Sequence, residues 1–163
     1  MNSSAKETIS PFEKLLADLT GAAVDYAVVG GVAVIANGYV RLTEDLDILV
    51  SNEPANLVKL LAVLARFGEG HARELSAEDF PRQEGSIRIM EDFDLDIFVL
   101  MQGNTLESFR PGLRRCESME TSFHYLSPQQ LIQLKQGSWR DKDQIDVLAM
   151  KEILARESRA GNP

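Results

Sequence analysis

The sequence predicts an α/β (α+β) protein with a small mixed β-sheet flanked by helices, and three patterns support this prediction. Between Tyr26 and Val50, a short β-branched strand, two glycines, a small apolar helix and a second strand follow one another. Ser86–Met90 and Phe93–Leu100 have the alternation and the central turn of a hairpin. Helix starts with proline in the first turn are found at Pro11, Pro54 and Pro128.

The first half of the chain is expected to alternate helices and strands. Met1 to Ser10 is polar and is expected to be frayed. The elements expected after it are a helix at Pro11–Gly21, a strand at Tyr26–Val29, a short buried helix at Val32–Asn37 ended by Gly38, a strand at Asp45–Val50, and a helix from Pro54 to Phe67 ended by Gly68.

The second half of the chain is expected to form the hairpin and then mainly helices, and no element is expected at Glu69–Glu84. Expected after the hairpin are a partly helical segment at Thr105–Arg115, an edge strand at Glu117–Leu126, and helices at Ser127–Gly137 and Asp141–Arg156. We expect one domain over residues 1–163, with a core at 10–126 and C-terminal helices at 127–158.

Composition narrows the class of protein. The net charge of −8 argues against broad, non-specific nucleic-acid binding, which depends on Lys and Arg at phosphates. Cys116 is the single cysteine, so an intramolecular disulfide cannot form and a reducing compartment is indicated. The start has no apolar signal core, and no apolar run approaches the roughly 20 residues of a membrane helix. We therefore expect a cytoplasmic protein without a membrane partner.

Two acidic strand patterns suggest a metal site. Asp45 and Asp47 share one face of their strand, about 7 Å apart, and Asp94 and Asp96 repeat the pattern. If the strands are neighbours, their carboxylates converge and suit Mg²⁺ or Mn²⁺ rather than Zn²⁺. Alternatively, an Asp-x-Asp pair can be a solvated strand end, and Asp94 is either a fourth acidic neighbour or such an end.

Gly30-Gly31 follows the first strand and begins the short helix. Backbone N–H groups at such a turn can hold a phosphate, because glycine lets the phosphate come close. The pattern is neither a P-loop nor G-x-G-x-x-G, so the alternative is a purely structural turn.

Together these motifs resemble a known signature. Val29, Gly30-Gly31, thirteen intervening residues, Asp45-Leu46-Asp47-Ile48 and the later Leu95-Asp96-Ile97 resemble the nucleotidyltransferase superfamily of the DNA polymerase β type. The finer pattern resembles the small bacterial nucleotidyltransferase-like proteins related to AbiEii toxins, through Arg41, Thr43, Asp45 and Asp47 and then Lys135, Arg140, Lys142, Asp143 and Asp146. Such toxins usually continue into a further helical region, so the resemblance supports the chemistry more than a toxin role.

The resemblance implies the nucleotidyltransferase fold and metal-dependent transfer of a nucleoside monophosphate from a nucleoside triphosphate to an acceptor hydroxyl. Asp45, Asp47 and Asp96 are then the catalytic residues and the ligands of two Mg²⁺ (or Mn²⁺) ions. Asp96 could also accept the proton of the attacking hydroxyl. The residues implied at the nucleotide or its phosphates are Gly30, Gly31, Arg41, Thr43, Lys135, Arg140 and Asp143.

The acceptor and partners stay open at this stage. An RNA end, a small molecule and a protein side chain are all compatible, and the toxin relatives rank RNA or toxin-type action slightly ahead of a small-molecule acceptor. An antitoxin partner or a homodimer could complete the acceptor pocket. A local basic patch for RNA would need these residues on one side: Arg110, Arg114, Arg115, Arg140 and Lys142. The alternative to an enzyme is a catalytically inactive nucleotide- or partner-binding module of the same fold.

Several of these residues also have a structural interpretation. Arg41 either contacts phosphate or pairs with Glu44 or Asp45, and Lys135 is either a phosphate ligand or a solvated helix residue. Arg140, Asp143 and Asp146 have the spacing of a helix-surface ion-pair network. We favour that interpretation for Asp146 and leave the other two open. Structural roles are expected for His71 and His124. Trp139 is expected to pack against the core or a helix cap, with stacking on a base as the alternative.

Overall fold

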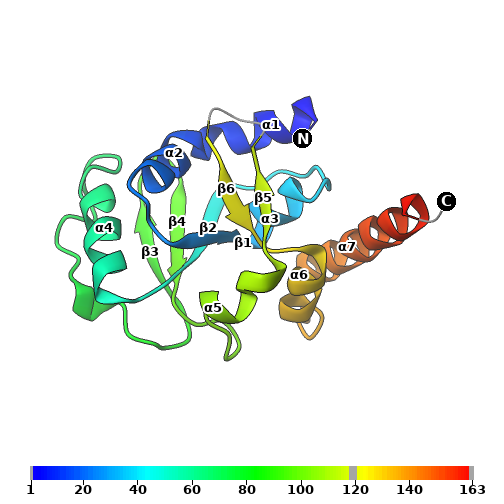
Figure 1. The fold of residues 1–163 in the computed structure, drawn as a ribbon. Helices are drawn as coiled ribbons and strands as arrows, with labels where there is room; N and C mark the ends of the chain where they lie inside the picture. The colour runs from blue at the N-terminus through cyan, green and yellow to red at the C-terminus, as the bar shows by residue number, and fades with distance from the viewer. Residues whose placement is uncertain (1, 118–120, 162–163) are drawn as a thin grey trace.

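The computed structural model describes residues 2–117 and 121–161, which form one six-stranded mixed sheet flanked by helices (Figure 1). The strands are β1 (Tyr26–Val29), β2 (Asp45–Val50), β3 (Ser86–Met90), β4 (Asp94–Phe98), β5 (Arg114–Cys116) and β6 (Phe123–Tyr125). Their order across the sheet is β3-β4-β2-β1-β6-β5. The β2–β4 and β1–β6 pairs are parallel and the other neighbours are antiparallel. The predicted α/β class with a mixed sheet is confirmed.

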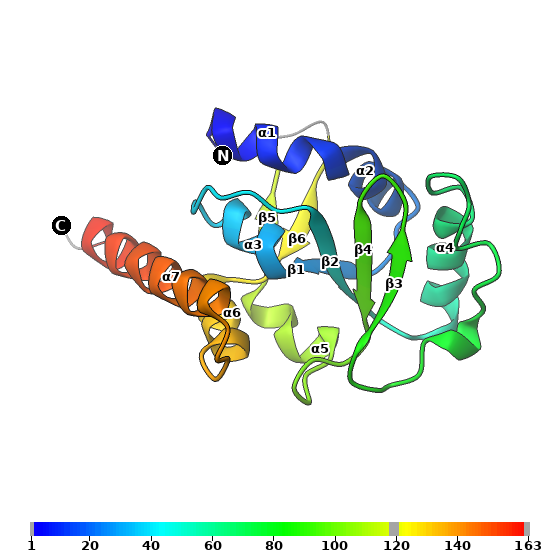
Figure 2. The same cartoon turned by 180° about the vertical axis from the view of Figure 1, so that it is seen from behind.

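Helices lie on both sides of this sheet. The α-helices are α1 (Ser3–Ile9), α2 (Glu13–Gly21), α3 (Gly30–Ala36), α4 (Pro54–Leu64), α5 (Leu106–Phe109), α6 (Pro128–Lys135) and α7 (Asp141–Ala160). Short 3₁₀ turns are η1 (Ser10–Phe12), η2 (Ala77–Asp79) and η3 (Arg110–Gly112). Viewed from behind, α4 and α7 stand at opposite sides of the sheet, and the C-terminal half of α7 extends away from it (Figure 2).

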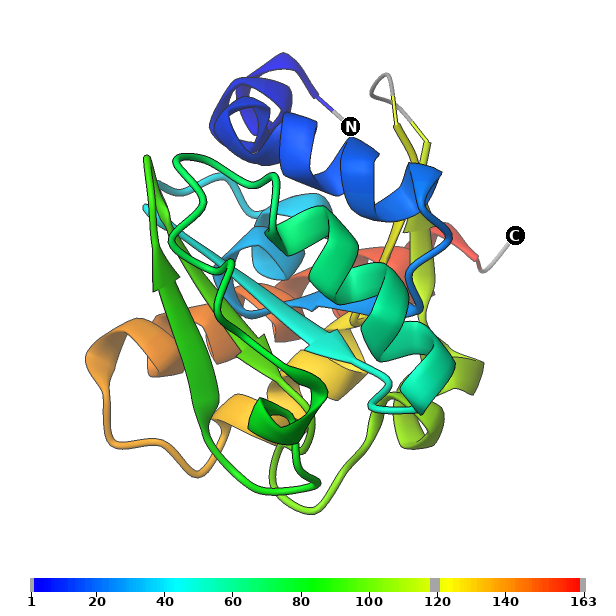
Figure 3. The ribbon, with the colours of Figure 1, turned by 90° about the vertical axis from the view of Figure 1, so that its left-hand side faces the viewer.

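The short helix α3 is buried, as predicted. Val32, Ala33, Val34 and Ile35 are fully inaccessible to solvent, and α3 packs against β1, β2 and α6. Figure 3, seen from the α4 side, shows α1 and α2 along one end of the strands and α6 and α7 behind the sheet. The unit from β1 to β2 is therefore central to the fold and enclosed from several directions. None of the described helices is long and apolar enough to cross a membrane.

The N-terminus differs from the prediction. Instead of a frayed end, residues 3–9 form α1, whose first turn is capped by the Asn2 side chain accepting from the Ala5 N–H at 2.8 Å. Ala5 and Ile9 are buried and lie four residues apart, on one face of the helix. Burial of these two apolar side chains holds the otherwise polar segment against the rest of the protein. The expected helix from Pro11 begins instead at Glu13, after η1.

Three further boundaries are corrected. Helix α4 ends at Leu64 rather than Phe67, although Gly68 has the expected positive φ of 57°. The strand predicted at 117–126 is shorter, at Phe123–Tyr125, and lies between β1 and β5 rather than at an edge. Part of that predicted strand, residues 118–120, lies outside the described residues. The segment 105–115 is partly helical as expected, but it ends in β5, which takes the edge position.

Candidate functional site

The parallel register of β2 and β4 brings the two acidic pairs together. Asp45 lies opposite Asp94, and Asp47 lies opposite Asp96. Neighbouring strands are about 4.8 Å apart, and alternate residues share a face, so the four carboxylates occupy one patch of the sheet. The prediction that the two acidic strands are neighbours is confirmed, with Asp94 as the fourth acidic member. We call these residues, together with Arg88, the strand cluster.

The two glycines give room to side chains of the site. Gly30 has φ of 63°, and a Cβ at this position would lie 2.0 Å from Oδ2 of Asp47. A Cβ at Gly31 would lie 2.8 Å from Nη2 of Arg41 and 3.2 Å from Oγ1 of Thr43. The glycine pair therefore has a structural reason, the close approach of these side chains. The predicted phosphate contact of Gly30 and Gly31 stays a prediction.

Asp47 is the carboxylate with the most unfavourable surroundings. Burial, the neighbouring charge of Asp96 and a hydrogen bond shared with it raise the pKa of Asp47 to about 7, with a further contribution from Asp45. The positive charge of Lys135 acts in the opposite direction. Close to neutral pH, the Asp47 carboxyl is thus poised between its protonated and ionised forms.

Arg88 is a site residue that sequence analysis missed. Its Nε and Nη2 donate to Oδ1 and Oδ2 of Asp96 at 3.0 and 2.8 Å, which is a bidentate pair. Its Nη1 donates to Asp94 at 3.3 Å, and Nη2 lies 3.7 Å from Oδ2 of Asp45. The hydrogen bonds to Asp96 are the main cause of the raised pKa of Arg88. The predicted hairpin had a two-residue turn at Glu91-Asp92, which would put Arg88 opposite Leu95, whereas the observed turn has three residues and puts Arg88 opposite Asp96.

A second group of charges lies where α6 and α7 meet the loop between α3 and β2. We call Arg41, Lys135, Ser138, Asp143 and Asp146 the helix cluster. Arg41 donates from Nε and Nη2 to the two oxygens of Asp146 at 2.9 and 3.0 Å. Lys135 Nζ donates to Asp146 at 2.8 Å and to Asp143 at 3.0 Å, and Ser138 Oγ donates to Asp143 at 2.8 Å.

The helix cluster corrects three expectations. Asp146 is not part of a surface network, because its exposed fraction is 0% and two cations bind it. Lys135 is not a solvated residue, since only 14% of its side chain is exposed. The acidic partner of Arg41 is Asp146, rather than Glu44 or Asp45. The burial follows from α7, on which Asp146, Val147 and Met150 form the inward face.

The remaining predicted residues lie around these clusters. Thr43 donates to the carbonyl oxygen of Asp45 at 3.2 Å, whereas Arg140 is exposed just before α7. His71 contacts the carbonyl oxygen of Met90 through Nδ1 at 2.7 Å, in agreement with a structural role. Trp139 was expected to pack against the core or a helix end, but this is wrong, because 87% of it is exposed. No described interaction joins the two histidines to the acidic residues of the strand cluster.

A pocket of about 310 Å³ joins the two clusters. Its polar wall includes Gly30, Asp47, Lys135 and Asp143. Its apolar wall consists of Phe98, Leu100, Met101, Leu131 and Leu134. A volume of this size with an apolar wall and a few convergent polar groups is typical of small-molecule sites.

The donor set suits a metal that is completed by a substrate. Among the described residues, no three His, Cys, Asp or Glu side chains are arranged to hold a metal ion by themselves. Mg²⁺, however, is usually bound by one or two carboxylates and by substrate phosphates. Asp47 and Asp96 are two such carboxylates, close enough to share a hydrogen bond and to repel each other. Two carboxylates at paired positions of β2 and β4 repel each other when both are ionised, and this favours a divalent cation at the position.

Comparison with known proteins gives no assignment, because neither any protein-family model nor any curated protein matches the chain.

Proposed function

We propose that this chain is a Mg²⁺-dependent nucleotidyltransferase that moves a nucleoside monophosphate from a nucleoside triphosphate to an acceptor hydroxyl. One observation carries the proposal, namely the direct register of Asp45 and Asp47 with Asp94 and Asp96 beside a pocket lined by Lys135. The resemblance of the motifs to the nucleotidyltransferase signature supplies the reaction class.

Asp47 and Asp96 are the residues that would hold the metal, with Asp45 beside them on the same face of β2. When bound, a divalent ion would lower the pKa of the acceptor hydroxyl and neutralise charge on the departing pyrophosphate. Both oxygens of Asp96 accept hydrogen bonds from Arg88, so we no longer assign Asp96 as the proton acceptor.

The two cations of the helix cluster receive different roles. Lys135 lines the pocket and acts electrostatically on Asp47, so we assign it to a phosphate of the nucleotide. Asp143 also lines the pocket and accepts a hydrogen bond from Lys135, so it positions the ammonium group. Arg41 donates both Nε and Nη2 to the fully buried Asp146, and we therefore assign Arg41 to anchoring α7.

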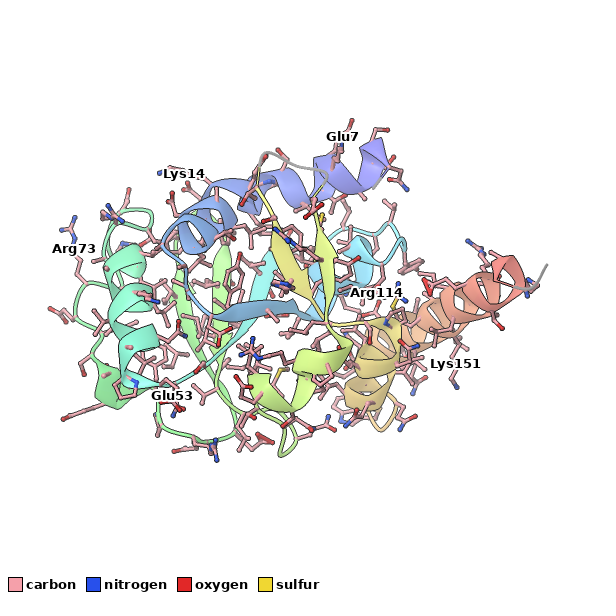
Figure 4. The ribbon with its side chains drawn as sticks, in the orientation of Figure 1. Glu7, Lys14, Glu53, Arg73, Arg114 and Lys151 are labelled. Carbon is pink, nitrogen blue, oxygen red and sulfur yellow. The ribbon has the colours of Figure 1, made fainter. Side chains whose placement is uncertain are left out.

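The acceptor fits a small molecule better than an RNA end. Three arginines of the expected basic patch are paired: Arg110 with Asp25 and Glu107, Arg114 with Glu157, and Arg115 with Glu117. In Figure 4, Arg114 lies between β5 and α7, where this pairing takes place. Arginines that are paired with carboxylates bind RNA phosphates less strongly, and the protein is acidic overall. A toxin role, an antitoxin partner and a homodimer stay predictions.

One observation favours a second function, a nucleotide-binding module without turnover. Arg88 occupies both oxygens of Asp96, which is the carboxylate expected nearest to the attacking hydroxyl. If the acceptor hydroxyl can lose its proton only to a free oxygen of Asp96, the chain would hold a nucleotide and transfer nothing.

Incubation with α-labelled ATP, CTP, GTP and UTP, Mg²⁺ and a cell extract tests the enzyme. We expect label on a non-nucleotide product with the wild type and with Asp25→Asn, and at least about 100-fold less with Asp47→Asn. Asp25 is a suitable control, since it is an ion-paired aspartate outside both clusters. Nucleotide binding without transfer by the folded wild type would favour the module, and a lack of binding would exclude both functions.

A further inference from the structure

The strand cluster contains a positively charged side chain, Arg88. Its position bears on how many metal ions the site can bind. The guanidinium of Arg88 lies within 3.7 Å of three carboxylates, those of Asp45, Asp94 and Asp96. Asp47 is the member of the cluster for which the structure gives no contact with Arg88. The four carboxylates are therefore divided between an end that faces a guanidinium and an end that faces the pocket.

At the end of the cluster that faces Arg88, Asp96 is held by three hydrogen bonds. Its Oδ1 accepts from Arg88 Nε at 3.0 Å and from Ser86 Oγ at 3.3 Å, and its Oδ2 accepts from Arg88 Nη2 at 2.8 Å. Arg88 and Ser86 extend from the same strand, β3, whose register with β4 places Arg88 opposite Asp96. An arginine stays protonated at any pH at which the protein is folded.

A pair of divalent ions would need the same oxygens. In two-metal sites the ions lie about 3.5–4 Å apart and share carboxylates between them. The candidates for sharing here are Asp45 and Asp96, and both face the Arg88 guanidinium. A second divalent ion, bridged to the first through those oxygens, would lie a few ångströms from a fixed positive charge, and at such a distance like charges repel strongly in a partly buried site.

We propose that Arg88 is a positioning residue that replaces one of the two metal ions, so that the site binds a single divalent ion together with the nucleotide. That the site binds a nucleotide rests on the proposed function, whereas the limit to one ion rests on the contacts of Arg88 alone. Arg88 orients Asp96 toward Asp47 and neutralises the end of the cluster that faces away from the pocket. The single ion would then be held by Asp47 and Asp96, at the end of the cluster that faces the pocket.

The number of bound Mn²⁺ ions tests this directly. Free Mn²⁺ is counted by electron paramagnetic resonance in the presence of the full-length protein, with and without a non-hydrolysable ATP analogue, whose own binding is measured by equilibrium dialysis. We expect one Mn²⁺ per bound analogue for the wild type and two for Arg88→Ala. Without the analogue, Arg88→Ala should bind Mn²⁺ on the order of tenfold more tightly than the wild type, because a like charge is gone.

Arg110→Ala is the matched control. Arg110 also binds an aspartate through two nitrogens, Nη1 and Nη2 to Asp25 at 3.1 and 2.7 Å, and its exposed fraction of 43% is close to the 50% of Arg88. We expect it to leave the Mn²⁺ count at one. Arg88→Lys, which keeps the charge, should also keep the count at one, and Arg88→Gln, which removes the charge but keeps a polar side chain, takes the place of Arg88→Ala if that variant does not fold.

Two results would overturn the inference: two Mn²⁺ ions per analogue in the wild type, or the same count and affinity in the wild type and Arg88→Ala. A protein that binds no analogue would contradict the proposed function instead. The comparison without analogue would still decide whether Arg88 competes with a metal ion.

Discussion

The two charged clusters differ in how the negative charge of their carboxylates is compensated. In the helix cluster, two carboxylates meet two cations, and the fully buried Asp146 receives hydrogen bonds from both. In the strand cluster, one guanidinium contacts three of the four carboxylates, and the pKa of the fourth, Asp47, rises to about 7. Balanced charge is what a structural anchor requires, whereas unbalanced charge needs a ligand or a proton. The difference separates Arg41 and Asp146, which hold the fold, from Asp47, which we expect to act on a substrate. Lys135 contributes to both through Asp146 and the pocket.

The largest effect is expected in the balanced cluster. Asp146→Ala would leave Arg41 and Lys135 without their shared partner at a largely buried position. Removal of one member of a buried ion pair typically costs about 3–5 kcal/mol. Urea unfolding followed by circular dichroism should show this loss, and Glu152→Ala, on the exposed side of α7, should change stability by less than about 1 kcal/mol. A loss below 1 kcal/mol for Asp146→Ala would contradict the anchoring role.

Gly30→Ala should have the next largest effect, because it combines two costs. The positive φ of 63° disfavours a side chain, and the new Cβ would displace Asp47. Together we expect a loss of about 2–4 kcal/mol. Gly103→Ala isolates the first cost, because its φ of 78° is similar and nothing lies within 4 Å of the added Cβ.

The double variant Gly30→Ala/Asp47→Ala separates the two costs further. If the carboxylate is the obstacle, the second substitution should restore about 1–2 kcal/mol of the loss. Equal stability of the Gly30→Ala variants with and without Asp47 would show that the contact is unimportant.

Asp47→Asn should stabilise the metal-free protein in a manner that depends on pH. The pKa of Asp47 is about 7 when folded and close to 3.9 when unfolded, so the folded state binds the proton more tightly. The stability that proton binding at Asp47 gives to the folded state is therefore fully present below about pH 4 and is lost as the pH rises through 7. With a chelator present, the variant should be more stable than the wild type by roughly 1–3 kcal/mol at pH 8 and by little at pH 4. Thermal unfolding at both pH values measures this, and a constant difference would exclude Asp47 as the titrating group.

The smallest expected effects come from one serine in each cluster. Ser138 donates to Asp143 at 2.8 Å, whereas Ser86 donates to Asp96 at 3.3 Å. Ser138→Ala should cost about 1 kcal/mol, and Ser86→Ala less than about 0.5 kcal/mol. Chemical denaturation of both variants would resolve the order, and a larger loss for Ser86→Ala would mean that the strand cluster is the more tightly organised one.

The same comparison shows what a sequence can disclose. The acidic strand pairs were predictable because a period of two residues fixes the face on which Asp45, Asp47 and Asp96 lie. Arg88 was missed because its partner depends on the length of the hairpin turn, and the predicted turn was one residue shorter than the observed one. The link from Arg41 to Asp146 was not predictable, since it joins positions 105 residues apart, and the burial of a charged helix residue depends on partners that local spacing does not specify.

The link from Arg88 to its acids, by contrast, is local, and this bears on the order of folding. Strands β3 and β4 form a hairpin of nearby residues, so Arg88 meets Asp94 and Asp96 early, on the time scale of hairpin closure, about 1–10 μs. The parallel pairing of β2 with β4 spans α4 and a long connection, and such non-local contacts form slowly. The four carboxylates are thus brought together only when a hairpin that already carries its own countercharge joins β2. Refolding should consequently accelerate with added salt, and the acceleration should be greater once Arg88 is replaced by alanine.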